Sequence, residues 1–408
     1  LVTIPSINFT GDDSNNGQGE IRFANSKAGQ MIALHTSGTG GAASHKKRTA
    51  LINAGDADLM LKITANGYAV GDIKAKNIIL TENDPLLLYD APTASRTYVI
   101  AGNGVQFAEK SNLSADNAAG KLIFDTKSEI ATGIAAGNRQ VTLADKVNFT
   151  GELTTTDTTK TATLVTSGES KINITNDFIT NKDHRSKVIF KASSATANKV
   201  AEYTFAKETI IADFTLGNVN ADMSISGPKT IHGDINGIGG HVGVVTLKNP
   251  MNIVGKVGDG HAVNKLVLEG DGEYVFGSED YASYNVATTH FKTNVKLKFH
   301  KDVVIAANNA LTVEKDGEGT FIATTENCPT VGNIGAADKH LGTFDASVVK
   351  NDLNIAHNFY VKNVILGTDT VTKITGVAAS DKEAVFGSKD KRGKSFTNNV
   401  ANFEASEL

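Results

Sequence analysis

The sequence predicts an all-β protein, built as a right-handed parallel β-helix or a similar β-solenoid. Short segments alternate apolar and polar residues, glycine-rich turns separate them, and the later segments follow at regular short intervals. Alternation with a period of two is typical of strands that bury one face. Many short, evenly spaced strands indicate a sandwich, a barrel or a solenoid. Tandem β-sandwich domains are therefore the alternative fold.

The alternation is clearest in the second half of the chain. Examples are Leu266 with Leu268, Tyr274 with Phe276, and the run through Val295, Leu297 and Phe299. Clusters such as 269–272 (EGDG) and 315–319 (KDGEG) separate these segments, and glycine there can adopt positive φ without steric cost. The alanine-containing runs at 115–119 and 131–136 are too short to form independent helices.

Two internal similarities favour the solenoid, because stacked repeats reuse the same turn chemistry at each corner. Residues 235–239 (INGIG) resemble 331–335 (VGNIG), and in both places a glycine and an apolar strand follow. The segment 275–278 (VFGS) returns unchanged at 385–388.

The first hundred residues are less regular, since 85–89 (PLLLY) and the basic loop 44–48 (SHKKR) interrupt the alternation. The stretch 111–119, rich in Ser, Asn and Ala, is typical of a linker. We therefore predict a less regular N-terminal β-rich domain over residues 1–110 and a repetitive region, β-solenoid-like or made of several sandwiches, over 111–408.

Composition excludes several classes of protein. Hydrophobic residues make up 40% of the chain and charged residues 21%, which predicts a folded protein rather than a disordered one. A net charge of −4 argues against nucleic-acid binding, which depends on concentrated Lys and Arg. Cys328 is the single cysteine, so neither an intrachain disulfide nor a cysteine metal cluster can form. No run approaches the roughly 18 apolar residues of a transmembrane helix.

One candidate metal site lies near the start of the chain. Residues 12–17 (DDSNNG) resemble the beginning of a calcium loop, with oxygen donors at alternate positions and a glycine at the sharp turn. The twelfth position, where a closing Glu is needed, is Phe23. A turn rich in Asp and Asn is the favoured interpretation, and calcium is the one cofactor that remains a candidate. Its ligands would be Asp12, Asp13, Asn16 and Glu20.

No catalytic or cofactor-binding residues are predicted. Residues 387–395 (GSKDKRGKS) are one residue too long for a phosphate-binding loop, and 38–41 (GTGG) lack the third glycine of a dinucleotide motif. His232, His241 and His261 share a glycine-rich stretch without zinc-site spacing. A polysaccharide-active β-helix is the enzymatic alternative, although 6% aromatics and no Trp supply a sugar-binding groove poorly.

Several strand leaders carry a family resemblance. The segments 332–335 (GNIG), 217–219 (GNV), 341–344 (LGTF) and 363–366 (NVIL) together resemble the passenger regions of rickettsial surface cell antigens. These autotransporters include outer-membrane protein B, and the resemblance spans roughly residues 120–380. It implies a passenger exposed on the bacterial outer surface, which forms a surface layer and takes part in host-cell adhesion.

The expected function is therefore that of a non-enzymatic structural protein of the bacterial cell surface with a role in adhesion. Its contacts would run through loops and exposed strand edges. The expected partners are further copies of the chain in a lattice, or a protein or glycan of the host-cell surface. An adhesin made of tandem β-sandwiches and a polysaccharide-active β-helix enzyme are the alternatives.

Overall fold

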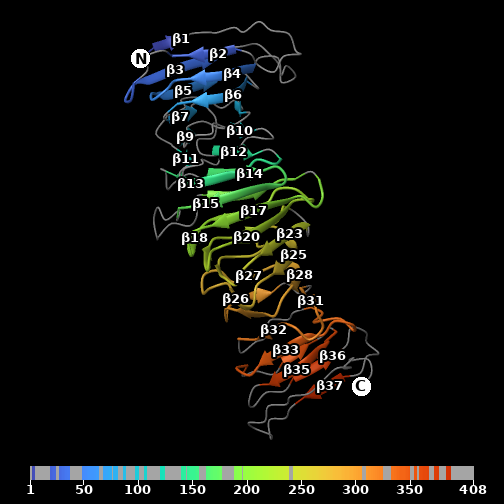
Figure 1. The fold of residues 1–408 in the computed structure, drawn as a ribbon. Coiled ribbons are helices and arrows are strands. Elements are labelled where there is room, and N and C mark those ends of the chain that lie inside the picture. The colour runs from blue at the N-terminus through green and yellow to red at the C-terminus, as the bar shows by residue number, and fades with distance from the viewer. Residues whose placement is uncertain are drawn as a thin grey trace. The chain divides into compact units, whose positions relative to one another are not determined.

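In a computed structural model, the described residues are 2–4, 19–23, 27–36, 48–63, 68–75, 77–80, 86–88, 97–100, 105–107, 120–124, 139–143, 145–155, 162–176, 188–194, 196–238, 242–305, 309–324, 332–349, 353–355, 358–366, 372–375 and 383–386. Contacts within the chain define two compact units, Leu1–Asp213 and Phe214–Leu408. Strands are the only regular elements in these ranges, and no helix occurs among them (Figure 1).

The first unit is a coil with two strands in each turn. Odd-numbered strands from β1 to β17 form sheet A of this unit and even-numbered strands from β2 to β16 form sheet B, with parallel pairing wherever a register is defined. The strands are β1 (Val2–Ile4), β2 (Gly19–Arg22), β3 (Met31–Thr36), β4 (Arg48–Asn53), β5 (Asp58–Ile63), β6 (Tyr68–Lys74), β7 (Asn77–Leu80), β8 (Leu86–Leu88), β9 (Thr97–Ile100), β10 (Val105–Phe107), β11 (Gly120–Phe124), β12 (Arg139–Leu143), β13 (Phe149–Thr155), β14 (Ala162–Thr166), β15 (Ser170–Ile174), β16 (Val188–Ala192), β17 (Val200–Phe205) and β18 (Thr209–Ile211).

The second unit is a coil with three faces. Along the chain, a strand of sheet A is followed by a strand of sheet D and then by a short strand or bridge of the third face, sheet B. Its strands are β19 (Asp213–Leu216), β20 (Asp222–Ser226), β21 (Thr230–His232), β22 (Ile235–Asn236), β23 (Val242–Leu247), β24 (Asn252–Val254), β25 (Val263–Leu268), β26 (Gly272–Phe276), β27 (Ser283–Tyr284), β28 (Val286–Phe291), β29 (Val295–Phe299), β30 (Val304–Ile305), β31 (Ala310–Val313), β32 (Thr320–Ile322), β33 (Leu341–Ala346), β34 (Leu353–Ile355), β35 (Val361–Leu366), β36 (Thr372–Thr375) and β37 (Glu383–Phe386).

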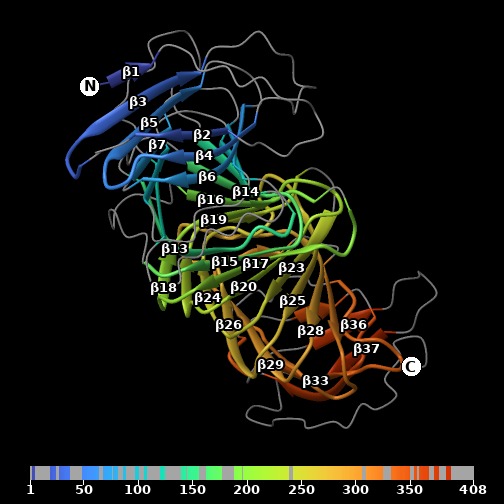
Figure 2. The same cartoon turned by 45° about the horizontal axis from the view of Figure 1, so that its top comes forward.

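Within the second unit, β20, β23, β25, β28 and β31 are the strands of sheet A. The first four of these strands are labelled in Figure 2. Sheet D contains β21, β24, β26, β29, β32, β33 and β35. The third face is short, and there the isolated bridges of Val257 join Ile235 to Tyr284. Parallel pairing ends at β36, because β37 runs antiparallel to it.

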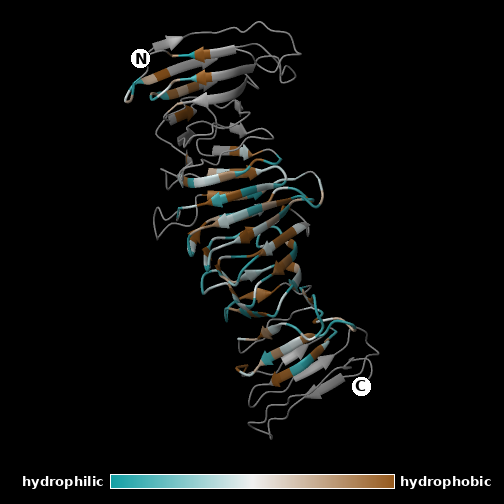
Figure 3. Cartoon of the chain, in the orientation of Figure 1, coloured by the Kyte–Doolittle hydropathy of each residue, from teal (hydrophilic) through white to brown (hydrophobic). Residues whose placement is uncertain are grey.

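The core lies inside the coils, because alternate residues are buried in the strands whose side chains are described. Figure 3 shows hydrophobic and hydrophilic residues interspersed along these strands. In the second unit, aromatic rings follow one another from coil to coil, and the centroids of neighbouring rings are 4.7–6.0 Å apart. The rings belong to Phe276, Tyr284, Phe299, Phe321, Phe344 and Phe359. Each such pair contributes about 0.5–1.5 kcal/mol beyond the burial of its area.

Several buried hydroxyl groups are hydrogen-bonded inside the coils. In the first unit the Tyr203 hydroxyl donates to Thr166 Oγ1 at 2.9 Å. In the second unit the Tyr284 and Thr289 hydroxyls are 2.7 Å apart, and Asn309 Nδ2 donates to Thr289 Oγ1 at 3.1 Å. Burial raises the pKa of Tyr203 and of Tyr284, so both phenols stay protonated.

The structure confirms the predicted parallel β-solenoid. Tandem β-sandwiches need antiparallel sheets, and the single antiparallel strand pair among the described residues is β36 with β37. The two internal similarities do not mark equivalent places, since Val275 lies in a parallel strand and Val385 in the antiparallel β37. Likewise, Ile238 is exposed, whereas Ile334, at the matching position of 331–335, is fully buried and bridges Leu311 of sheet A.

The predicted boundary near residue 110 stays a prediction. On either side of it the same pairing pattern holds, since β9 pairs with β11 and β10 pairs with β12.

Candidate interaction surface

Four charged residues form a column at the end of sheet A in the second unit. Each one directly follows a strand: Lys248 follows β23, Glu269 follows β25, Lys292 follows β28 and Glu314 follows β31. Their backbone N–H groups extend the sheet pairing by one residue, for example from Lys292 to the carbonyl of Leu268 at 3.0 Å. Adjacent strands lie about 4.8 Å apart, so the column places one charge per coil. We call these four residues the charge ladder.

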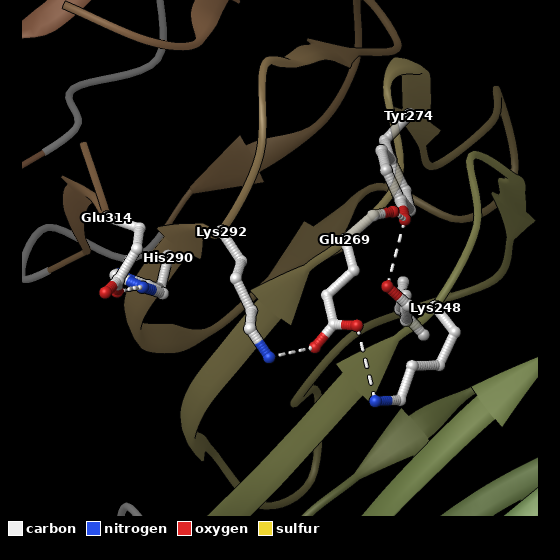
Figure 4. Close-up of polar contacts among 7 residues, drawn as sticks. Lys248, Glu269, Tyr274, His290, Lys292 and Glu314 are labelled. Atoms are coloured by element: carbon white, nitrogen blue, oxygen red, sulfur yellow. Dashed lines mark hydrogen bonds and ion pairs between the residues drawn. The ribbon is translucent and has the colours of Figure 1, made fainter. Parts of the chain in front are cut away.

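The first three members of the charge ladder are ion-paired, with Glu269 between the two lysines (Figure 4). Lys292 Nζ lies 2.7 Å from Glu269 Oε1, and Lys248 Nζ lies 3.3 Å from Glu269 Oε2. The Glu269 side chain is only 18% exposed, whereas Lys248 is 44% and Lys292 is 52% exposed. The carboxylate is therefore embedded between two cations whose amino groups reach solvent.

The environment of Glu269 keeps it ionised. Burial acts to raise the pKa of this carboxyl, but the hydrogen bonds and positive charges of Lys292 and Lys248 outweigh burial and hold the pKa below its ordinary value. From inside the coil, the Tyr274 hydroxyl donates to the backbone carbonyls of Leu247, at 3.0 Å, and of Glu269 (Figure 4). This buried contact fixes the backbone from which Glu269 projects.

Glu314, the last member of the charge ladder, contacts a histidine rather than a lysine. Its Oε2 lies 3.1 Å from His290 Nε2, and His290 Nδ1 lies 2.9 Å from Thr312 Oγ1. Burial and the charge of Lys265 lower the pKa of His290, although Glu314 acts in the opposite direction. The imidazole is therefore neutral at neutral pH, with Nε2–H donating to Glu314 and Nδ1 accepting from Thr312.

A second polar cluster lies in the turn between β31 and β32. Lys362 Nζ is 2.5 Å from Asp316 Oδ2, while the backbone N–H and Nδ1 of His340 are 2.7 Å and 2.9 Å from Asp316 Oδ1. The hydrogen bond from Lys362, followed by that from the His340 backbone, holds the pKa of Asp316 well below its usual range. The aspartate thus ties its own turn to two later segments of the coil.

These carboxylates are suited to holding charge rather than to donating protons. The pKa values of Glu269, Glu314 and Asp316 are all lowered, whereas the general acid of a glycoside hydrolase needs a raised pKa. Among the described carboxyl groups whose pKa departs from its ordinary value, Asp222 alone is raised, because it is partly buried. Its Oδ1 accepts the backbone N–H of Val244 at 2.9 Å.

Most of the residues singled out from the sequence lie outside the described residues. This holds for Asp12, Asp13 and Asn16, and Glu20 lies in β2 with a side chain that is not described, so the calcium site stays a prediction. His232 and His261 are exposed, while His241 and Cys328 are outside the described ranges. Where the structure describes side chains, no group of three or more His, Cys, Asp or Glu is placed to hold a metal ion.

Sequence reasoning assigned contacts to loops and strand edges and did not find the charge ladder. A signal was present, because the four ladder residues end the triplets TLK, VLE, HFK and TVE, at 246–248, 267–269, 290–292 and 312–314. Each triplet places a large apolar residue just before a charge, and the sign of the charge alternates. These triplets recur at the length of one coil.

No helix in the described part of the chain is long and apolar enough to cross a membrane. Comparisons with protein-family models, with curated proteins and with solved structures gave no match to the chain.

Proposed function

We propose that this chain is a non-enzymatic structural protein of the bacterial cell surface, with a role in adhesion. The observation that carries the proposal is the outward face of sheet A in the second unit, where each coil adds one side chain to each row. Such a face offers regularly spaced contacts over several coils. This arrangement suits binding to another macromolecule better than enclosing a small substrate, which needs a concave site.

The chemistry of the face agrees with a binding role. Its carboxylates already have partners, since Glu269 is ion-paired with two lysines and Glu314 is hydrogen-bonded to His290. A stack of coils that buries aliphatic and aromatic rows also needs no disulfide for stability, because each fully buried large side chain contributes about 1.5–3 kcal/mol. A cysteine-poor chain of this kind tolerates a location outside the cell.

The resemblance to rickettsial autotransporter passengers supports the surface location. In the structure, the resembling segments occupy recurrent places in the coil: Gly217 follows β19, residues 332–335 precede β33, and residues 341–344 and 363–366 lie in β33 and β35. They are thus corners and strands of the repeating unit.

Surface exposure can be tested on the cells that make the protein. We expect protease added to intact cells to remove the chain, and antibodies against the second unit to label unpermeabilised cells. Beads coated with the purified chain should bind host cells more than beads coated with a heat-denatured sample. Full protection from protease in intact cells would contradict the proposal, as would turnover of a polysaccharide in a broad glycan screen.

A further inference from the structure

We propose that sheet A of the second unit pairs face to face with the same sheet of a second copy of the chain, through the charge ladder. This inference names a second copy of the chain as the partner of the proposed structural protein. Its biological role rests on that proposed function. The pairing itself is a property of the isolated protein.

The ladder is self-complementary under a two-fold rotation. Read along the coils, its charges are positive, negative, positive and negative at Lys248, Glu269, Lys292 and Glu314. A two-fold axis that runs parallel to the strands, between β25 and β28, reverses the order of the coils. Lys248 then faces Glu314 of the second copy, and Glu269 faces Lys292. Every charge meets its opposite, as a symmetric dimer interface requires.

The neighbouring rows of sheet A fit the same axis without facing like charges. Within one chain, Lys265 pairs with Thr288 and Val267 pairs with His290 on adjacent strands. The rotation places β25 of one copy over β28 of the other. Lys265 therefore faces Thr288 of the second copy, and Val267 faces His290 of the second copy. His290 is neutral at neutral pH and adds no charge there. The remaining positions are Val244 against Ala310 and Thr246 against Thr312, and all four of these side chains are half-buried.

The coils outside the ladder also carry opposite signs, with Asp222 on β20 at one end and Lys339 after Ile334 at the other. Lys339 is exposed and lies close enough to Glu314 to lower the pKa of that carboxyl. Asp222 itself lies outside the ladder column, because it pairs with Val244 near the start of β23.

The size of the face makes this a weak association. Four strands about 4.8 Å apart, each about five residues long, cover roughly 300 Å² of sheet. Stable complexes bury about 800 Å² per partner, so the dimer should form only at high protein concentration. Because the contacts are exposed ion pairs, dissolved salt should dissociate it.

Sedimentation velocity of the purified chain tests the pairing directly. We expect dimers as the concentration approaches about 1 mM in about 0.01 M salt, and monomers in about 1 M salt, where charges are screened within about 3 Å. A chain that stays monomeric across this concentration range at low salt would overturn the inference.

Charge reversals identify the surface. Glu269→Lys and Lys292→Glu should each abolish the dimer, because each places two like charges across the axis at its centre. An equimolar mixture of the two single variants should associate again, since every charge of one then faces its opposite in the other. The double variant E269K/K292E should also pair with itself. Rescue in the mixture cannot come from an effect on the folding of one chain.

The matched control is Lys298→Glu on β29, which reverses a lysine on sheet D and should leave association unchanged. The inference is overturned if the mixture stays monomeric although circular dichroism shows both variants folded, or if K298E weakens association as much as E269K. Monomers combined with surface labelling of cells would remove the pairing and leave the proposed surface location standing. Dimers combined with full protection from protease on intact cells would support the pairing and contradict the proposed surface location.

Discussion

The ring of Phe291 packs directly against Gly319. A Cβ added to this glycine would lie 2.3 Å from Phe291 Cδ2, and the glycine φ of +83° is one that L side chains rarely adopt. The turn between β31 and β32 therefore needs glycine both for its backbone conformation and for the close approach of the neighbouring coil.

Replacing Gly319 with alanine should destabilise the second unit by about 1–3 kcal/mol, because the methyl group overpacks the core against Phe291 and strains the turn. The measurement is the midpoint of urea unfolding followed by circular dichroism. Gly260→Ala is the matched control, since a Cβ at Gly260 meets no atom within 4 Å. Equal midpoints for the two variants would show that the turn adjusts without cost.

Removing the Phe321 ring should open a cavity in the aromatic row. The ring is fully buried and lies 6.0 Å from Phe299 and 5.6 Å from Phe344 between centroids. Phe321→Ala should cost about 3–5 kcal/mol, the usual range for a large buried aromatic side chain. Thermal melting should show a clear decrease, whereas Val304→Ala, at a side chain that is 72% exposed, should leave the transition nearly unchanged. A small effect of F321A would mean that this part of the coil is loosely packed.

The buried pair of Tyr203 and Thr166 offers a double-mutant cycle in the first unit. Tyr203→Phe should destabilise by about 1–2 kcal/mol, because it removes the donor to a buried Thr166 hydroxyl. Adding Thr166→Val should recover part of this loss, since no unpaired polar group then remains at that place. The cycle is read from urea unfolding of the four proteins. Strictly additive losses would show that the hydrogen bond contributes no coupling energy.

Acid should weaken the second unit partly through Asp316. Its pKa in the folded chain lies below the unfolded value of about 3.9, so its stabilising effect is present above that pH and is lost as the pH falls through the folded pKa. Asp316→Asn should therefore lower the melting temperature near neutral pH and flatten its decrease on acidification. Asp271→Asn, at an exposed aspartate in the turn after β25, serves as the control and should follow the wild type. Parallel acid profiles for wild type and D316N would show that the contacts of Lys362 and His340 add no stability.

Local patterns in the sequence were enough to predict the strands and many of the corners. Leu266 and Leu268 are both fully buried and lie in β25, and glycines 270 and 317 adopt positive φ in the turns predicted at 269–272 and 315–319. Such features depend on residues that are close along the chain, because side-chain alternation and turn conformation are set within a few positions. The stacked architecture followed from the same regularity.

The tertiary structure decided which strands pair and which side chains meet. The partners of a coil contact are commonly 22–25 residues apart, as for Asp222 with Val244 and Asn294 with Gly319, and the spacing changes from coil to coil. A turn that is one residue longer shifts every later position, so neither the change from two faces to three nor the alignment of Lys248, Glu269 and Lys292 could be derived from local pattern. The sequence by itself determined that this chain forms short strands with one buried face. Only the packing of successive coils, which sets the register between distant segments, decided that charges of alternating sign form one column.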